Sequence, residues 1–194
     1  FEHASLSFAA SRGDGVEGQN LLSKIKYSMP QMYLRFKHLP KVSLRGEVLL
    51  KGELFKEFGL KNRRNSVTGI LRRDEIDPKI LSKFSIIFYE LIESPSELKT
   101  EVERLEFIKE LGFEVARYMV IPKDLPTDAK IQVLQDFLSH LKETANYDID
   151  GLVLTRNNSK RENVMSPKNK IKFKVNQLAV RCKVIGMEWN VTRV

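Results

Sequence analysis

We predict an α+β protein with antiparallel sheets from three observations on this sequence. Short apolar segments typical of strands alternate with longer amphipathic segments typical of helices, but without the regular strand–helix–strand rhythm of a doubly wound parallel sheet. No glycine-rich loop has the spacing of a Rossmann or P-loop nucleotide site. Apolar residues make up 42% and charged residues 30% of the chain, which favours a folded domain over a disordered tail.

The predicted strands are short segments rich in apolar and β-branched residues. The strand at 42–50 is interrupted by Gly46 and Glu47, whereas the one at 84–92 is strongly apolar. The full set of predicted strands covers residues 4–10, 42–50, 84–92, 113–121, 149–154, 171–175 and 178–191.

The predicted helices are placed by capping residues and by apolar side chains that recur at helical spacing. Asp77 and Pro78 form a helix start, and Ser94 with Glu97 fits a capping box that opens a helix ending at Gly112. A second amphipathic helix begins at Asp128. A short helix is predicted over residues 51–58, residues 21–29 form a short, weakly amphipathic segment, and residues 61–73 form a basic segment with few apolar anchors.

Charge and cysteine content restrict the partners and the compartment. The chain has 33 Lys and Arg residues against 25 Asp and Glu, so its formal net charge of +8 indicates either a polyanionic partner such as nucleic acid or simply a solvated basic surface. The single cysteine, Cys182, excludes an internal disulfide and fits a reducing, cytoplasmic location. The isolated histidines His3, His38 and His140 argue against a structural zinc site. Because the chain begins at Phe1 rather than Met, we expect it to be a piece of a longer polypeptide.

Two glycine-containing motifs carry charged residues in unusual places. The segment Arg12-Gly13-Asp14-Gly15 is typical of a tight turn, and a purely structural role is the simpler interpretation. In the predicted strand 42–50, the sequence Arg45-Gly46-Glu47 places two charges around a glycine. This pattern indicates either a ligand lying against the sheet or an ion pair on its solvent face.

A basic cluster is the best candidate for a phosphate-binding site. Arginine guanidinium groups bind phosphate oxygens through two parallel hydrogen bonds, and asparagine amides add further donors. A solvated charge run is the alternative. The candidate residues are Asn62, Arg64, Asn65 and Arg72.

The C-terminal part of the chain supplies an acid and a row of lysines. Asp150 lies at the entrance of the predicted strand 149–154 and is a candidate metal or ribose ligand, or else a turn cap. Lys168, Lys170, Lys172 and Lys174 alternate, so on a strand they would share one face. Four like charges on one face favour an anionic ligand such as phosphate, or a lysine-protected sheet edge.

Taken in order, these motifs resemble the adenylation domain of bacterial-type NAD-dependent DNA ligases. Each motif alone is weak evidence, but five in the same order are fairly specific. The matching segments are residues 11–18 with Arg12-Gly13-Asp14-Gly15, residues 44–50 with Arg45-Gly46-Glu47, residues 62–72 with Asn62-Arg63-Arg64-Asn65, residues 147–153 with Asp150-Gly151, and Ile171-Lys172-Phe173. The segment Met187-Glu188-Trp189-Asn190 is similar to the start of the OB-fold that follows the domain in this family.

The resemblance implies a nucleotidyltransferase fold, the fold of DNA ligases and mRNA capping enzymes, over residues 1–175, with an OB-fold beginning at 176–194. It also implies NAD as the AMP donor, Mg²⁺, and nicked double-stranded DNA as the partner. Arg12 and Glu47 would line the nucleotide pocket, Asp150 would organise the metal and the reaction centre, and Lys172 would contact the α-phosphate. The block that contains Asn62, Arg64, Asn65 and Arg72 would contact adenylate or DNA phosphates.

The sequence also departs from the family. The family's nucleophilic lysine belongs to a Lys-x-Asp-Gly motif that this chain lacks, so we expect the isolated chain to be inactive in self-adenylation. A second chain or a missing N-terminal segment would supply that lysine. Thr155 stands where relatives have the lysine that ends the fourth motif. Two alternatives remain, namely a non-catalytic nucleic-acid-binding subunit with the same fold, and an ATP- or GTP-dependent RNA ligase or capping-type enzyme.

Overall fold

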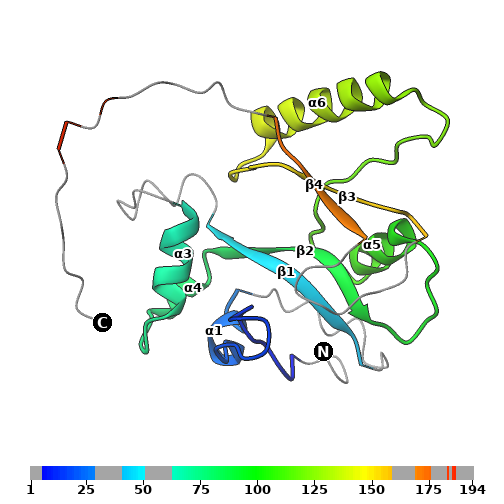
Figure 1. The fold of residues 1–194 in the computed structure, drawn as a ribbon. Helices are drawn as coiled ribbons and strands as arrows, with labels where there is room; N and C mark the ends of the chain where they lie inside the picture. Colours follow the sequence, from blue (N-terminus) through cyan, green and yellow to red (C-terminus); the bar gives the residue numbers. More distant parts are fainter. Residues whose placement is uncertain are drawn as a thin grey trace.

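A computed structural model gives the fold of residues 6–28, 41–50, 63–158, 169–175, 183, 185 and 186, with only the backbone described for residues 63–65. The described chain contains two separate two-stranded antiparallel sheets with helices packed around them (Figure 1). The prediction of an α+β protein with antiparallel sheets is therefore confirmed. No helix of these segments is long and apolar enough to cross a membrane.

The first sheet pairs β1 (Ser43–Leu50) with β2 (Phe84–Glu93). Both strands match the predicted segments. The register places Arg45 opposite Glu90 and Gly46 opposite Phe88, so the pairing passes over Tyr89 as in a β-bulge. Bulges change the direction in which a side chain points and occur often beside functional sites.

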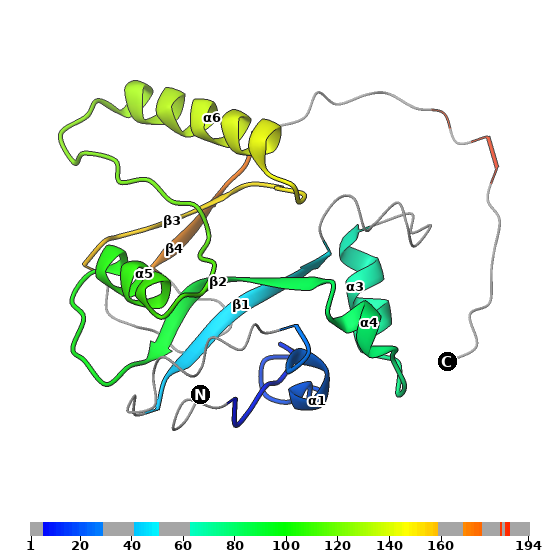
Figure 2. The same ribbon diagram turned by 180° about the vertical axis from the view of Figure 1, so that it is seen from behind.

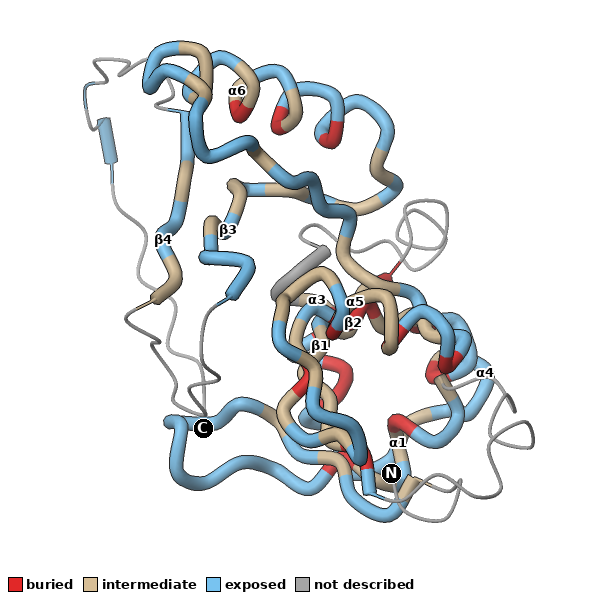
Figure 3. Tube along the Cα trace, turned by 90° about the vertical axis from the view of Figure 1, so that its right-hand side faces the viewer, coloured by how far each residue is buried: buried red, intermediate tan, exposed pale blue. Residues whose placement is uncertain are grey.

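The first sheet buries its apolar face against α1 (Leu22–Ile25), α3 (Arg63–Leu71), α4 (Pro78–Leu81) and α5 (Glu101–Glu110). Ile108 is fully buried in this core. Figure 3 shows buried residues gathered around this sheet and, separately, along one side of a further helix, α6. The core residues are Leu21, Ile25, Val42, Leu50, Val67, Ile70, Leu71, Leu81, Phe84, Phe88, Leu91, Ile108 and Leu111.

The basic segment 61–73 contains helix α3, which the sequence analysis did not predict. The apolar residues Val67, Ile70 and Leu71 recur at helical spacing and are all buried, so three anchors suffice to hold a helix that is otherwise polar. Lys24 of α1 donates hydrogen bonds at 2.7 Å to the carbonyl oxygens of Leu71 and Arg73. A lysine in this position satisfies carbonyl groups that a helix leaves unpaired at its C-terminal end.

The starts of the next two helices give one confirmed and one wrong prediction. The Asp77 carboxylate caps α4 by accepting a hydrogen bond from the Lys79 N–H at 2.8 Å, as predicted. Helix α5 does not begin at Ser94. Its N-cap is Thr100, which forms a capping box with Glu103, and the helix ends just before Gly112.

The second sheet pairs β3 (Leu152–Thr155) with β4 (Lys170–Phe173), and α6 (Thr127–Thr144) lies on its far side from the first sheet (Figures 1 and 2). Both strands fall within or next to predicted segments. Helix α6 confirms the predicted amphipathic helix and buries Leu134, Leu138 and Leu141 on one side.

Two predicted strands do not form. In the segment 6–10, Ala10 makes an isolated antiparallel bridge with Asn20, and in 113–121 Val115 makes an isolated parallel bridge with Phe88 of β2. The second bridge is limited to the hydrogen bonds of Phe88. Its N–H donates to the Glu114 carbonyl oxygen, and its carbonyl oxygen accepts from the Ala116 N–H. The predicted helix at 51–58 lies outside the described residues, as does almost all of the predicted strand at 178–191.

Candidate nucleotide-binding cleft

The candidate site has two walls. The first wall comprises β1, β2 and the turn that carries Arg12, and the second wall comprises β3 and β4. The Asp14 carboxylate accepts hydrogen bonds from the N–H groups of Val16 and Glu17 at 2.9 and 2.8 Å, and these bonds, the one from Glu17 most of all, lower the pKa of Asp14. Gly13 has φ of 54°, and a Cβ there would lie 1.6 Å from the Glu17 carbonyl oxygen. The tight-turn interpretation of this motif is therefore confirmed, and the turn holds Arg12 at its base.

Strand β1 contributes the motif Arg45-Gly46-Glu47. A Cβ at Gly46 would lie 2.9 Å from the Ile87 carbonyl oxygen and 3.0 Å from the Phe88 ring, so the glycine accommodates the neighbouring strand. The group that lies close to Gly46 in the structure thus belongs to β2. Arg45 forms an ion pair with Glu90 of β2, with 2.5 Å between Nη1 and Oε2.

Tyr89, at the bulge of β2, lies near the charged residues of the turn and of β1. Burial raises the pKa of its phenol, and the charges of Arg45, Glu47, Glu90 and Arg12 also act on it. Its side chain keeps an exposed part, with the residue 41% exposed. An aromatic ring that is partly buried and partly open to solvent can offer an apolar face to a flat ligand.

The second wall comes from β3 and β4, where the lysines meet carboxylates. Lys170 reaches Glu90 of the first sheet with 2.5 Å between Nζ and Oε1, while Lys172 and Lys174 lie 3.5 and 3.1 Å from Oδ2 of Asp150. Lys168 lies outside the described residues. The alternating lysines favoured a phosphate ligand in the sequence analysis. The three of them that the structure describes are each paired with a carboxylate of the protein.

A large open cleft runs between the two walls. Arg12, Glu47 and Tyr89 line it from the first wall, and Thr155 and Lys170 line it from the second. Asp150, Lys172 and Arg72 do not belong to its lining as far as the described residues define it. The structure thus brings together Arg12 and Glu47, whereas Asp150 and Lys172 pair with each other beside the cleft.

The structure describes part of the arginine block, which comprises Asn62, Arg64, Asn65 and Arg72. Arg64 and Asn65 lie in the first turns of α3, where only the backbone is described, and Asn62 lies outside the described residues. Arg72 is exposed and directly follows α3, where its N–H donates to the Thr68 carbonyl oxygen at 3.2 Å. An exposed arginine at the end of a helix is available to a phosphate in solution, but the geometry of the block as a whole stays a prediction.

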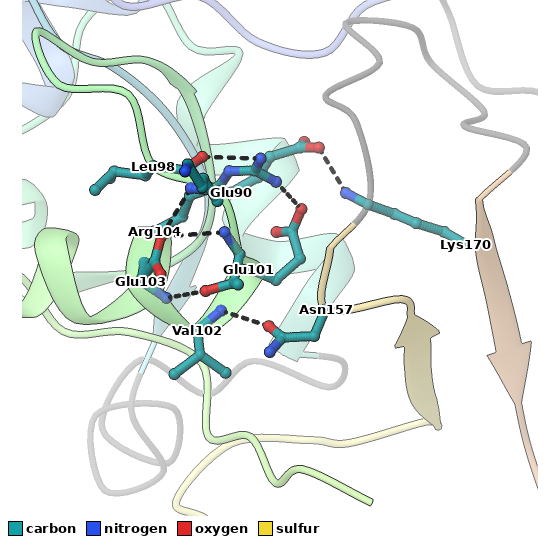
Figure 4. Close-up of polar contacts among 10 residues, drawn as sticks. Glu90, Leu98, Glu101, Val102, Glu103, Arg104, Asn157 and Lys170 are labelled. Atoms are coloured by element: carbon teal, nitrogen blue, oxygen red, sulfur yellow. Dashed lines mark hydrogen bonds and ion pairs between the residues drawn. The ribbon is translucent and has the colours of Figure 1, made fainter. Parts of the chain in front are cut away.

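Sequence reasoning missed Glu90, Tyr89 and Asn157. Glu90 is an acid inside an otherwise apolar strand, and that isolated charge was a signal that could have identified it. Asn157 follows β3 and accepts hydrogen bonds from the first two N–H groups of α5. Its side-chain oxygen accepts from Val102, and its backbone carbonyl oxygen accepts from Glu101 (Figure 4). No local pattern around Asn157 indicates this contact.

Comparison with known proteins decides the family. The family model of the NAD-dependent DNA ligase adenylation domain matches residues 1–171. The chain belongs to this family. The nucleotidyltransferase fold expected from the sequence follows from this membership.

Curated relatives agree with the family assignment. The adenylation domain described here is 29% identical to a DNA ligase of Clostridium tetani over 99% of this chain, and 28% identical to DNA ligase 2 of Clostridium acetobutylicum over 95% of it. A DNA ligase of Clostridium botulinum strain Alaska E43 is also 29% identical, over 99% of this chain. The chain spans about 30% of the length of these relatives.

Proposed function

We propose that the chain supplies the nucleotide pocket of an NAD-dependent DNA ligase, which seals nicks in duplex DNA. In this reaction AMP passes from NAD to a lysine of the enzyme and then to the 5′-phosphate of the nick, and the 3′-hydroxyl finally displaces AMP. The observation that carries the proposal is the cleft that Arg12, Glu47 and Tyr89 line together. The names of the relatives support the same activity.

The cleft residues fit a nucleotide chemically. The Glu47 carboxylate can accept hydrogen bonds from ribose hydroxyl groups, and the half-exposed Tyr89 ring can pack against a base. Arg12 can hold a phosphate oxygen, and the arginines Arg64 and Arg72 with Asn62 and Asn65 are proposed to contact phosphates of adenylate or DNA. Phosphoryl transfer depends mainly on such positioning and on stabilisation of charge.

Asp150 and Lys172 have a different part in the proposal. Asp150 lies within 3.5 Å of two lysines, and all three side chains are about half exposed, so its carboxylate pairs with these lysines at the surface. In the part of the chain that is described, no group of three His, Cys, Asp or Glu side chains is arranged for a metal. These residues alone therefore do not fit a Mg²⁺ site, and no step of the proposal passes through the ion. Lys172 remains the proposed contact to the α-phosphate.

The domain organisation is part of the proposal. Residues 1–175 form the adenylation domain, and an OB-fold begins within residues 176–194. The nucleophilic lysine comes from outside this sequence, through a longer polypeptide or a second chain, because the chain has no Lys-x-Asp-Gly motif. A cytoplasmic location fits this activity and the single cysteine.

The direct test is nick sealing by the complete gene product. With NAD and a duplex that carries one 5′-phosphorylated nick, we expect sealing and a protein that gains the mass of one AMP. Sealing with ATP but not with NAD would favour the ATP-dependent relatives. Binding of the nicked duplex without sealing or AMP transfer would favour a non-catalytic subunit.

Glu47→Ala is the variant that connects this activity to the cleft. Loss of the carboxylate leaves ribose hydroxyls without their acceptor, so we expect slower formation of protein–AMP from NAD. Binding to nicked DNA should stay close to that of the unmodified protein, as measured by gel shift. Glu47→Gln removes the charge of the side chain but keeps its shape and one acceptor oxygen. It therefore distinguishes the effect of the charge from the effect of the hydrogen bond. Weakened DNA binding with unchanged adenylation would remove Glu47 from the nucleotide pocket.

A further inference from the structure

Glu90 connects the two walls of the cleft through one carboxylate. Its Oε2 accepts a hydrogen bond from Arg45 of β1, and its Oε1 accepts one from Lys170 of β4, both at 2.5 Å. Figure 4 shows Lys170 reaching from β4 toward Glu90. The Glu90 side chain is 14% exposed and that of Lys170 is 22% exposed, so this contact is largely shielded from water.

The two cations belong to segments that line or border the cleft. Arg45 lies two residues before Glu47, so both project from the same face of β1. Lys170 lies opposite Thr155 in the second sheet and two residues before Lys172. The Glu90 carboxylate therefore joins the sheet that carries Glu47 to the strand that carries the lysines.

The charges explain why this contact matters more than an ordinary surface ion pair. Hydrogen bonds between ionised groups are shorter and stronger than neutral ones, and screening by water is reduced where the groups are partly buried. Without the carboxylate, Arg45 and Lys170 would both lose a charged partner in a region shielded from solvent, which is unfavourable. With it, the three groups keep a net charge of one positive unit beside the cleft, which suits an anionic ligand.

A second contact between the walls serves as a comparison. Asn157, after β3, accepts hydrogen bonds from the first two N–H groups of α5, and α5 packs on β2. This contact is uncharged and satisfies a helix end. Both contacts lie on the cleft, but the one through Glu90 joins charged side chains.

We propose that Glu90 is a positioning residue, which holds Arg45 and Lys170 across the cleft and thereby sets the spacing of the two walls for the phosphate of the bound nucleotide. The proposal rests on the proposed function and deepens it. Glu90 itself need not touch the nucleotide. Glu90 acts through Lys170 and Arg45. A substitution of Glu90 should therefore change kcat/KM, and its effect should not add to that of a substitution of Lys170.

The test compares Glu90→Gln, Lys170→Met and the double variant in the complete gene product. The glutamine keeps the shape of the side chain and removes its charge. We expect Glu90→Gln to lower kcat/KM for NAD in protein–AMP formation on the order of tenfold to a hundredfold, as misplaced pocket residues do. The double variant should be no slower than the slower single variant, because both changes break the same contact. Glu90→Asp should restore part of the activity.

Glu106→Gln, on α5, is the matched control. Glu106 accepts a hydrogen bond from Tyr118 at 2.6 Å and pairs with Lys109 at 3.4 Å, and it does not belong to the described lining of the cleft. We expect its kcat/KM to equal that of the unmodified protein. Thermal unfolding of each variant reports folding separately. If Glu90→Gln does not fold, Lys170→Met breaks the same contact from the second sheet and must show the loss of kcat/KM.

Two results would overturn the proposal while the proposed function stands. One is an unchanged kcat/KM for Glu90→Gln in a protein whose Glu47→Ala variant is impaired. The other is additive losses in the double variant, which would mean that Glu90 and Lys170 act independently. A complete gene product that forms no protein–AMP with NAD would instead remove the proposed function, and this proposal with it.

Discussion

Gly46 shows at the level of one residue how the sequence and the fold constrain each other. A Cβ at Gly46 would meet the Ile87 carbonyl oxygen, Cγ2 of Ile86 and the Phe88 ring, at 2.9 to 3.0 Å. We expect Gly46→Ala to lower the free energy of unfolding by about 1–3 kcal/mol, because β1 and β2 must move apart to admit the methyl group. Urea unfolding of the variant measures this change.

Gly69 is the matched control, since it also stands inside a regular element. It lies in α3, and a Cβ there would meet nothing within 4 Å. Gly69→Ala should therefore stabilise the protein by about 0.5–1 kcal/mol, the usual difference between these residues inside a helix. Equal effects of the two substitutions would contradict the assigned role of Gly46.

The residues of the site differ in how far the sequence could predict them. Arg12 and Glu47 stand in short motifs, and the structure places both on the same cleft. Glu90 could not be assigned in the same way, because its two partners lie 45 residues before it and 80 residues after it in the chain. An isolated acid in an apolar strand indicates a special role but does not say which cation it meets.

At the level of elements, the start of α5 shows why one helix prediction was wrong. Ser94 with Glu97 and Thr100 with Glu103 both fit the capping-box pattern. The structure uses the second, because all four of the first N–H groups then find acceptors. Glu101 and Val102 donate to Asn157, whereas Glu103 and Arg104 donate to Thr100. Asn157 is 55 residues away from Val102, so no local pattern could decide between the two starts.

Thr100→Ala tests this arrangement. Loss of the capping hydroxyl should lower the free energy of unfolding by about 1 kcal/mol, as for other N-cap threonines. Thr127→Ala is the control, because the N-cap of α6 is Pro126 and provides no capping side chain. Thermal and urea unfolding of both variants measure the difference. A Thr100→Ala protein as stable as Thr127→Ala would mean that Asn157 alone maintains the helix start.

At the level of the whole molecule, the fold class followed from the sequence but the assembly of the two walls did not. The order of strands and helices predicted antiparallel sheets because it lacks a regular alternation, and both sheets are antiparallel. How the second sheet meets the first depends on contacts between distant residues, such as Lys170 with Glu90. Periodicity describes which side of an element is apolar, and it carries no information on which charged groups meet across a cleft.

The last prediction concerns the 194-residue chain as a whole. Its net charge of +8 favours binding to DNA through phosphate contacts, so binding to a nicked duplex should weaken steeply as salt is raised. With NAD and Mg²⁺, however, this chain should form no stable lysine–AMP adduct. A nucleophilic amine must lie in line with the α-phosphorus and offer a lone pair. Lys170, Lys172 and Lys174 instead pair with the carboxylates of Glu90 and Asp150.

Mass spectrometry of the intact chain, with and without NAD, measures the adduct. Addition of the segment that carries a Lys-x-Asp-Gly motif, in a longer polypeptide or as a second chain, should restore adenylation, with AMP on the lysine of that motif. A gain of one AMP by the 194-residue chain alone, mapped to one of its own lysines, would contradict the prediction. It would also move the reaction centre onto β4, where a lysine would first have to leave its carboxylate partner before it could attack the phosphorus.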